Sequence, residues 1–134
     1  MNRVVVDASV AVKWFLPEVH GAAAARLLNE QHGLCAPDLL FAEVGNALWK
    51  RVRGGEIVKE DAVAALGILD TVPIEIYPSK LLMASAMEIA CATGRTVYDS
   101  LYLALAVLLD SRIVTADRKL HDAIKTGFLA ERVW

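Results

Sequence analysis

The chain has 134 residues, which is enough for one domain with an ordinary hydrophobic core but leaves little room for a second. Its formal net charge of −2 argues against binding to nucleic acid through overall positive charge, although a local basic rim beside an acidic centre stays compatible with RNA. Apolar residues make up 56% of the sequence, above the roughly 45–50% of soluble domains, so either alanine-rich helices or a surface covered by a partner explains the excess.

The sequence predicts a soluble, cytoplasmic protein without membrane association. The apolar run Val4–Val6 is interrupted by Asp7 and is too short for the core of a signal peptide. The longest apolar stretch, Leu101–Leu109, is about half of what a membrane-spanning helix requires. Cys35 and Cys91 are too few for a disulfide framework, and we expect both to be reduced and buried.

The first elements alternate between β-type and helical patterns, which is typical of an α/β domain with a largely parallel sheet. The β-branched run at residues 3–6 predicts a strand that is buried on both faces of the sheet. We expect a helix through residues 11–15 that stops before Pro17. A second helix is expected over residues 20–31, with Gly33 ending it.

A short strand over residues 34–36 should end at Pro37, and a long helix should follow it. Asp38 is the predicted N-cap of this helix, which runs to about Arg53 before two glycines end it. The next helix is expected from about residue 59 to residue 70.

The second half of the chain repeats the alternation. The expected elements are a strand at 74–76, a helix at 79–92 capped by Ser79, a very apolar helix at 97–109, a strand at 112–115, a helix at 118–125 and an edge strand at 132–134.

Two carboxylates follow predicted strands directly. Asp7 ends the first strand, and Asp117 lies just after the strand at residues 112–115. Ligands of open parallel sheets bind beyond the carboxyl ends of the strands. If these two strands are neighbours, both carboxylates therefore emerge at the same edge of the sheet.

Two further carboxylates occupy apolar helix faces. Glu43 lies four residues after Leu39 and four before Ala47, and Asp99 is followed by Tyr102 and other apolar residues at helical spacing. A carboxylate that faces inward is costly unless it has a partner, a hydrogen-bonding shell or a metal ion.

Each carboxylate also has a structural explanation. Asp7 and Asp117 could cap the helices that follow them, Asp99 could form a capping box with Thr96, and Glu43 could neutralise a buried arginine. The four together are harder to explain in this way, because two carboxylates about 4 Å apart repel by roughly 4 kcal/mol at an effective dielectric of 20. Oxygen ligands without a Cys/His cluster suit Mg²⁺ or Mn²⁺ and not zinc.

Four segments resemble the motifs of the PIN-domain family, in the right order and over nearly the whole chain. They are Val-Val-Val-Asp7-Ala-Ser9, Glu43-Val-Gly-Asn46-Ala-Leu, Thr96-Val-Tyr-Asp99-Ser-Leu-Tyr-Leu-Ala-Leu-Ala and Val114-Thr115-Ala-Asp117-Arg-Lys-Leu. The third and fourth segments are fairly specific, whereas the first alone would be weak. The chain length suits the single-domain VapC toxins of this family.

The resemblance implies a single PIN domain over residues 1–134, folded as a three-layer α/β/α sandwich with a central parallel sheet. It also implies an endoribonuclease that depends on Mg²⁺ or Mn²⁺. As partners it implies an RNA substrate, a second copy of the chain in a homodimer, and a VapB-type antitoxin that blocks the acidic site.

The resemblance assigns roles to the site residues. Asp7, Glu43 and Asp99 would hold one or two ions, and Asp117 would complete the site by binding a second ion or orienting the attacking water. Ser9 and Thr115 would support the site by hydrogen bonding, although local backbone capping is an equal alternative for both. Asn46, one turn beyond Glu43, is a further supporting residue. An RNA-contacting rim would be drawn from Lys13, Lys50, Arg51, Arg53, Arg95, Arg118 and Lys119.

Other functional classes fit less well. A phosphoryl-receiving regulatory domain needs an aspartate at the end of its central strand, and residues 74–77 offer none. A haloacid-dehalogenase-type phosphatase needs Asp-x-Asp after the first strand, where this chain has Asp7-Ala-Ser9. A binding module that keeps the PIN fold without catalysis remains the serious alternative.

Overall fold

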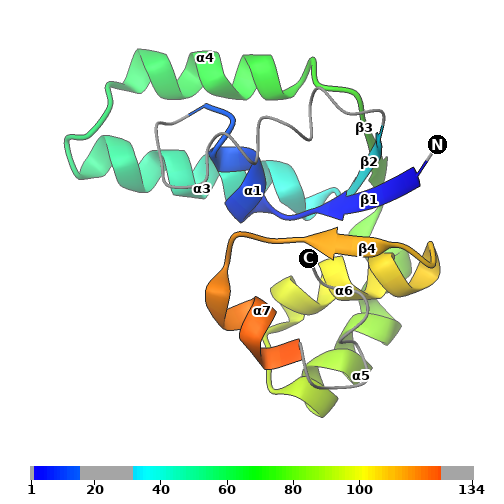
Figure 1. The fold of residues 1–134 in the computed structure, drawn as a ribbon. Helices are drawn as coiled ribbons and strands as arrows, with labels where there is room; N and C mark the ends of the chain where they lie inside the picture. The colour runs from blue at the N-terminus through cyan, green and yellow to red at the C-terminus, as the bar shows by residue number, and fades with distance from the viewer. Residues whose placement is uncertain (1, 16–31, 125–134) are drawn as a thin grey trace.

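A parallel sheet of four strands forms the centre of the protein, which we describe from a computed structural model over residues 2–15 and 32–124 (Figure 1). The strand order is β3-β2-β1-β4, and all three pairings are parallel. The strands are β1 (Asn2–Val6), β2 (His32–Pro37), β3 (Ile74–Tyr77) and β4 (Arg112–Val114). The predicted α/β class with a parallel sheet is therefore confirmed.

Helices cover both faces of this sheet. Figure 1 shows α1 (Ala8–Val12), α3 (Leu39–Arg53) and α4 (Lys59–Leu69) on one side of the sheet. The other side carries the 3₁₀ turn η1 (Ser79–Leu82) and the helices α5 (Met83–Thr93), α6 (Val97–Leu108) and α7 (Arg118–Ile124). This is the three-layer α/β/α sandwich that the family resemblance implied. The helix predicted at residues 20–31 and the strand predicted at 132–134 lie outside the described residues.

The core is built around β1 and α6. Val4, Val5 and Val6 are at most 1% exposed, because β1 lies between two strands and is covered on both faces. Every residue from Leu101 to Ala106 is buried, as expected for a helix that is apolar on all sides. In the described part of the chain, no helix is long and apolar enough to cross a membrane.

Helix α1 differs from its predicted range at both ends. The Asp7 side chain accepts the N–H of Val10, so the helix starts at Ala8 and not at Ala11. After Val12 the backbone continues in tighter turns, since the N–H of Phe15 bonds to the carbonyl of Val12.

Asp38 does not cap α3 through its side chain, contrary to the prediction. Its carboxylate accepts the N–H and the hydroxyl of Ser79 instead, which joins the end of β2 to the start of η1. Ser79 was predicted to cap a helix, but it is the first residue of the 3₁₀ turn η1 and does not cap an α-helix. Strand β2 also continues through Pro37, which is in register with Tyr77 and was expected to end the strand.

The two cysteines have different environments. Cys35 is buried in β2, as predicted, but Cys91 is exposed on α5, so the prediction of two buried thiols is wrong for Cys91.

Ser100 gives a test of the packing of α6. Its side chain is fully buried, and its hydroxyl makes no hydrogen bond within the described residues. We expect Ser100→Ala to raise the free energy of unfolding by about 1 kcal/mol, because the variant removes an unsatisfied polar group and favours the helix. Urea denaturation of the metal-free protein measures this, with Ser85→Ala on the exposed side of α5 as the control. A less stable Ser100→Ala variant would contradict the prediction.

Candidate active site

The candidate site lies where β1 and β4 end. The two strands are parallel neighbours with Val6 opposite Val114, and the N–H of Asp7 points at the carbonyl of Val114 over 3.4 Å. Asp7 follows β1 directly, and Asp117 lies three residues beyond the end of β4. The structure thus places both aspartates at one edge of the sheet, as the strand pattern predicted.

Asp7 is the most buried carboxylate of the site, with 6% of its surface exposed. The hydroxyls of Ser9 and Thr115 each donate to one of its oxygens over 2.5 Å, and the N–H of Val10 adds a longer bond of 3.3 Å. Burial nevertheless raises the pKa of Asp7 to about 6, because it outweighs these hydrogen bonds, and the charge of Asp117 acts in the same direction.

Ser9 and Thr115 connect the two loops that follow the strands. Ser9 Oγ accepts the N–H of Ala116 over 2.9 Å, and Thr115 Oγ1 accepts the N–H of Asp117 over 3.0 Å. The two hydroxyl oxygens lie 3.3 Å apart. Each hydroxyl therefore contacts the Asp7 carboxylate and also satisfies a backbone N–H.

Glu43 enters the site from α3 and contacts a buried tyrosine. The Tyr102 hydroxyl, on α6, donates to Glu43 Oε1 over 2.7 Å, so the bond shown for Glu43 comes from a tyrosine and not from the buried arginine considered above. Burial raises the pKa of Glu43; the Tyr102 hydrogen bond opposes this effect, and the charge of Asp99 adds to it. The Tyr102 side chain is 1% exposed, and burial likewise raises the pKa of its hydroxyl.

Arg95 pairs with two of the acidic residues. Its Nε and Nη2 lie 3.2 and 2.7 Å from the same oxygen of Asp99, and its Nη2 lies 3.9 Å from Asp117. The Asp99 N–H donates to Thr96 Oγ1 over 3.1 Å, which is half of a capping box, but the Asp99 carboxylate bonds to Arg95. Arg95 thus supplies positive charge beside Asp99 and Asp117 without any metal ion.

Asp117 also has a local structural role. Its Oδ1 accepts the N–H of Lys119 over 2.9 Å and that of Leu120 over 3.3 Å, at the start of α7. Its Oδ2 is the atom that faces Arg95. Asn46 is exposed on α3, one turn beyond Glu43, and lines a cleft beside the carboxylates.

The carboxylate oxygens of the site are suitable ligands for a hard divalent cation. In this structure, however, the carboxylates are not arranged around a common point. In residues 2–15 and 32–124, no three carboxylate, imidazole or thiol groups lie close enough together to hold a metal ion. Asp99 is bonded to Arg95 and Glu43 to Tyr102, each through one carboxylate oxygen. The raised pKa values of Asp7 and Glu43 mark negative charge that a cation would stabilise.

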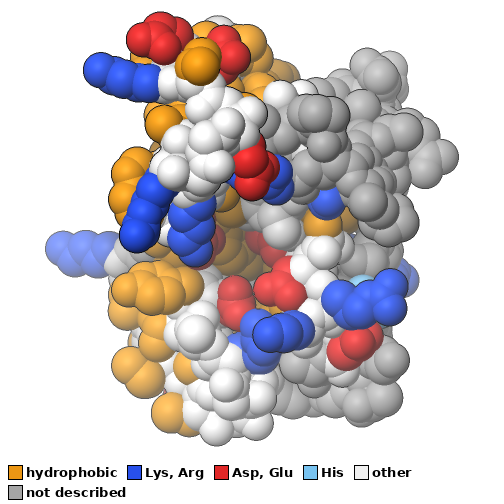
Figure 2. Space-filling model, turned by 90° about the vertical axis from the view of Figure 1, so that its left-hand side faces the viewer, with side chains coloured by type: hydrophobic (Ala, Val, Ile, Leu, Met, Phe, Trp, Pro, Cys, Tyr) orange, Lys and Arg blue, Asp and Glu red, His pale blue; other side chains and the backbone are white. Residues whose placement is uncertain are grey.

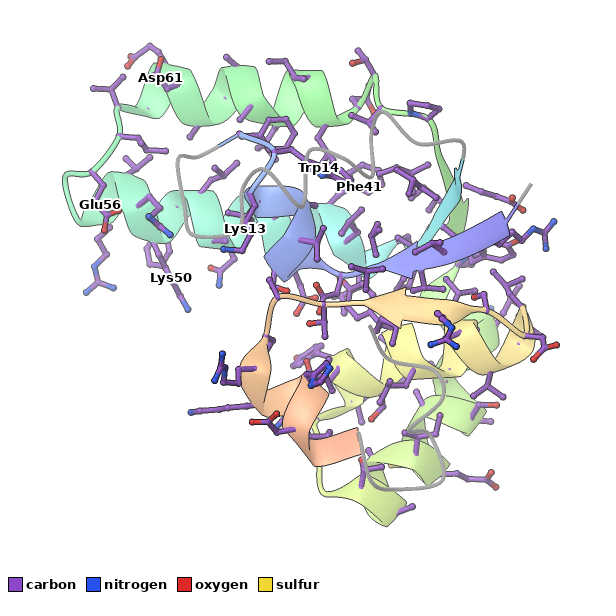
Figure 3. All side chains as sticks on the ribbon, in the orientation of Figure 1. Lys13, Trp14, Phe41, Lys50, Glu56 and Asp61 are labelled. Carbon is purple, nitrogen blue, oxygen red and sulfur yellow. The ribbon has the colours of Figure 1, made fainter. Side chains whose placement is uncertain are left out.

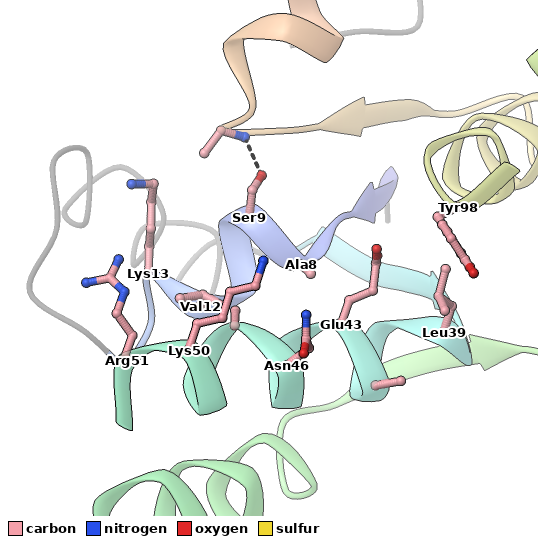
Figure 4. A pocket seen from close by; sticks show the side chains of 13 residues that line it. Ala8, Ser9, Val12, Lys13, Leu39, Glu43, Asn46, Lys50, Arg51 and Tyr98 are labelled. Carbon is pink, nitrogen blue, oxygen red and sulfur yellow. Dashed lines mark hydrogen bonds between the residues drawn. The ribbon is translucent and has the colours of Figure 1, made fainter. Parts of the chain in front are cut away.

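A cleft of about 690 Å³ opens beside the carboxylates, between α1 and α3. Figure 2 shows acidic side chains within a hollow of this face and basic side chains above and below them. In Figure 4, Glu43, Asn46 and Lys50 point into the cleft from α3, and Tyr98 lies at one end. Ser9 points from α1 toward Ala116, whose N–H it accepts. The remaining lining residues include Ala8, Val12, Lys13, Leu39, Arg51 and Ala116.

Tyr102 was not predicted to be a site residue, and Arg95 was predicted only as a possible RNA contact. Both carry a local signal, because Tyr102 lies three residues after Asp99 and Arg95 lies four residues before it. Such spacings bring side chains together on a helix surface.

Comparison with known proteins identifies the family. Residues 4–125 match the model of the PIN domain. Ribonuclease VapC1 of Mycobacterium tuberculosis is 37% identical over 124 residues, which cover 92% of each chain. Ribonuclease VapC3 of Pyrobaculum aerophilum is 32% identical over 122 residues, covering 90% of this chain and 93% of the relative. The chain therefore belongs to the PIN-domain family and, within it, to the VapC type.

Solved structures agree with this fold. A crystal structure of a Pyrobaculum aerophilum protein, 26% identical, superposes with a TM-score of 0.72 over 92% of this chain and 81% of its own. The Mycobacterium tuberculosis toxin VapC20 gives a TM-score of 0.73 over 96% of this chain and 98% of its own, at 18% identity, which shows the fold alone.

Because Asp7 is buried, we expect the free energy of unfolding to depend on pH. Its pKa rises from 3.8 to about 6 on folding, so between these values the folded chain binds more protons than the unfolded chain, and stability falls as the pH rises. Above this window the ionised carboxylate costs on the order of 2–3 kcal/mol. We therefore expect Asp7→Asn to be more stable than wild type by about 1–3 kcal/mol at pH 7.5 in EDTA, with the gain vanishing toward pH 4.

Urea denaturation between pH 4 and 8 measures this difference. Asp61→Asn, on the exposed first turn of α4, is the control and should show no such pH-dependent gain. An Asp7→Asn variant that is no more stable than wild type at pH 7.5 would contradict the account of Asp7 given above.

Proposed function

We propose that the protein is a VapC-type endoribonuclease that needs Mg²⁺ or Mn²⁺ and acts as a toxin held inactive by a VapB-type antitoxin. The observation that carries the proposal is the buried Asp7 carboxylate, which two hydroxyls hold at the sheet edge and whose pKa the charge of Asp117 helps to raise, as the charge of Asp99 does for Glu43. The ribonuclease names of relatives that are 32–37% identical over about nine-tenths of the chain support the same activity.

Each site residue has a role in this proposal. Asp7, Glu43 and Asp99 hold the cation, and Asp117 binds a second ion or orients the attacking water. Ser9 and Thr115 fix the Asp7 carboxylate in one orientation through their 2.5 Å hydrogen bonds. Tyr102 does the same for Glu43 from the core side. Arg95 bonds to one oxygen of Asp99, so the other oxygen can serve as a ligand while the guanidinium stays beside the site.

The proposed reaction is hydrolysis of a phosphodiester bond. A bound divalent cation supplies Lewis acidity, which makes water a better nucleophile and neutralises charge on the reacting phosphate. Water adds to phosphorus while the bond to the 3′ oxygen breaks, so the products are a 5′ phosphate and a 3′ hydroxyl. A 2′,3′-cyclic phosphate product would rule out this mechanism, because it requires the 2′ hydroxyl as the nucleophile.

Exposed apolar side chains support the proposed protein partners. Val63 and Ile68 on α4 are 60% and 56% exposed, and Leu81 in η1 is 74% exposed. These exposed apolar side chains, together with membership of the VapC type, favour a homodimer and a bound antitoxin. They do not assign either partner to a particular surface.

Cleavage of RNA tests the proposed activity directly. Purified chain, stripped of any partner, is incubated with total cellular RNA in EDTA, in Mg²⁺ and in Mn²⁺. We expect discrete fragments only with a divalent ion, and a loss of at least a hundredfold in rate for Asp7→Asn, which removes a charged ligand but leaves the protein folded.

The Asp7→Asn protein also excludes a contaminating nuclease. If folded wild-type protein binds the ion but cleaves no RNA, the chain is instead a binding module that keeps the PIN fold without catalysis.

Arg95 should compete with the cation for Asp99. We expect Arg95→Gln to bind Mn²⁺ about tenfold more tightly than wild type, because the variant removes a positive charge near the ion and releases an Asp99 oxygen. Isothermal titration calorimetry in the absence of RNA measures this affinity. Arg112→Gln is the matched control, since Arg112 starts β4 at the opposite edge of the sheet. Equal Mn²⁺ affinity for Arg95→Gln and wild type would contradict the competition.

A further inference from the structure

Every carboxylate of the site already accepts a hydrogen bond through at least one oxygen. The donors are hydroxyls, a guanidinium and backbone N–H groups. Their positions decide which carboxylate oxygens are open to a cation. The oxygens that accept these bonds are Glu43 Oε1, Asp99 Oδ2, Asp117 Oδ1 and both oxygens of Asp7.

Glu43 and Asp99 each keep one oxygen without a donor. Among the described residues, no donor bonds to Glu43 Oε2 or to Asp99 Oδ1. Glu43 is also reached from the cleft, into which its side chain points from α3 (Figure 4). A cation can therefore bind one oxygen of each carboxylate while the existing hydrogen bonds stay in place. Binding through both oxygens of Glu43 would instead disturb the bond from Tyr102.

Tyr102 holds Glu43 from a rigid position in the core. Its side chain is 1% exposed, and its neighbours along α6 from Leu101 to Ala106 are buried as well. In Figure 3, α3 and α6 lie on opposite sides of the sheet, so the hydrogen bond between Tyr102 and Glu43 joins the two helical layers. Because close packing fixes the ring, the hydroxyl cannot follow Glu43 into another orientation. The bond therefore restrains the carboxylate and leaves Oε2 as its open oxygen.

Divalent cations differ in the carboxylate geometry that they accept. Mg²⁺ needs near-ideal octahedral geometry, binds few carboxylates and keeps several of its waters, and Mn²⁺ likewise suits octahedral oxygen sites. Ca²⁺ takes about six to eight oxygens in flexible geometry and often binds both oxygens of one carboxylate. A site that offers single oxygens from restrained carboxylates therefore favours Mg²⁺ or Mn²⁺.

We propose that Tyr102 is a positioning residue that makes the site select Mg²⁺ or Mn²⁺ over Ca²⁺, by restricting Glu43 to one ligand oxygen. This inference rests on the metal site of the proposed function and gives a physical basis for its choice of ion. Tyr102 acts through Glu43 and contacts neither the ion nor the RNA. Its hydroxyl is neutral, so its removal tests geometry, whereas replacing Arg95 alters the attraction for every cation.

Competition between Mn²⁺ and Ca²⁺ tests the proposal without RNA. Electron paramagnetic resonance measures free Mn²⁺ as it is titrated into the full chain, and added Ca²⁺ then displaces the bound Mn²⁺. We expect Tyr102→Phe to bind Mn²⁺ about tenfold more weakly than wild type, because residues that orient metal ligands typically contribute at least this much. Its Ca²⁺ affinity should stay equal or rise, since Glu43 can then offer both oxygens. The preference for Mn²⁺ over Ca²⁺ should therefore fall about tenfold or more.

Tyr98→Phe is the matched control. It removes the same hydroxyl from the same helix, at a position that is 61% exposed, and both affinities should equal those of wild type. Urea denaturation in EDTA shows whether Tyr102→Phe is folded. A purely structural defect would lower the affinities for the two ions in parallel, so the ratio of affinities distinguishes positioning from general damage.

A double variant tests whether the effect passes through Glu43. Glu43→Gln keeps an oxygen that can accept the Tyr102 hydroxyl, but an amide cannot offer two ligand oxygens. When Tyr102→Phe is added to Glu43→Gln, the preference between the two ions should therefore stay as it is in Glu43→Gln alone.

Two results would overturn the proposal. The first is an unchanged preference between the ions in folded Tyr102→Phe. The second is an equal fall in preference with and without Glu43→Gln, which would show that Glu43 is not involved. Selectivity that depends on Tyr102 in a chain that cleaves no RNA would overturn the proposed nuclease and leave this inference standing. A folded wild-type chain that binds neither ion would overturn both proposals.

Discussion

The structure of the site depends on one arrangement, the burial of the Asp7 carboxylate between hydroxyls from two different strand ends. Ser9 follows β1 and Thr115 follows β4. Thr115 donates to Asp7, and Ser9 accepts the N–H of Ala116, so these bonds join the two parallel strands at their carboxyl ends. Burial still outweighs these bonds, so the pKa of Asp7 stays raised. The folded chain therefore holds a buried negative charge that lowers its stability, as is common at functional sites.

The carboxylates of Glu43 and Asp99 have different kinds of hydrogen-bond donor. Glu43 is held by a neutral donor, the Tyr102 hydroxyl, which orients the carboxylate without cancelling its charge. Asp99 is held by the cationic Arg95, which does neutralise it and also faces Asp117. In the absence of a metal ion, the site is thus partly compensated on the α6 and α7 side and uncompensated on the β1 and α3 side. Arg95 therefore offsets part of the negative charge at this end of the sheet.

Patterns that act over short range or follow from sheet geometry could be predicted from the sequence. The β-branched strands, the edge position of Asp7 and Asp117, and the inward placement of Glu43 and Asp99 all follow from periodicity and the rule for parallel sheets. Contacts between distant segments could not be predicted in this way. The bond between Asp38 and Ser79 joins residues 41 positions apart, and the one between Tyr102 and Glu43 spans 59. Arg95 was among the residues expected to contact RNA, and its spacing of four residues from Asp99 permits an ion pair without requiring one.

The sequence separation of these contacts has a consequence for the order in which the site forms. Arg95 and Asp99 are four residues apart, so their ion pair can form as soon as the corner between α5 and α6 is folded. Asp7 and Thr115 are 108 residues apart, and closing so long a loop is slow compared with local folding. During synthesis from the N-terminus, Asp7 has no β4 beside it until nearly the whole chain has been made. Thr115 follows Asp99 by only 16 residues, so the ion pair between Arg95 and Asp99 can form shortly before the buried Asp7 site is completed.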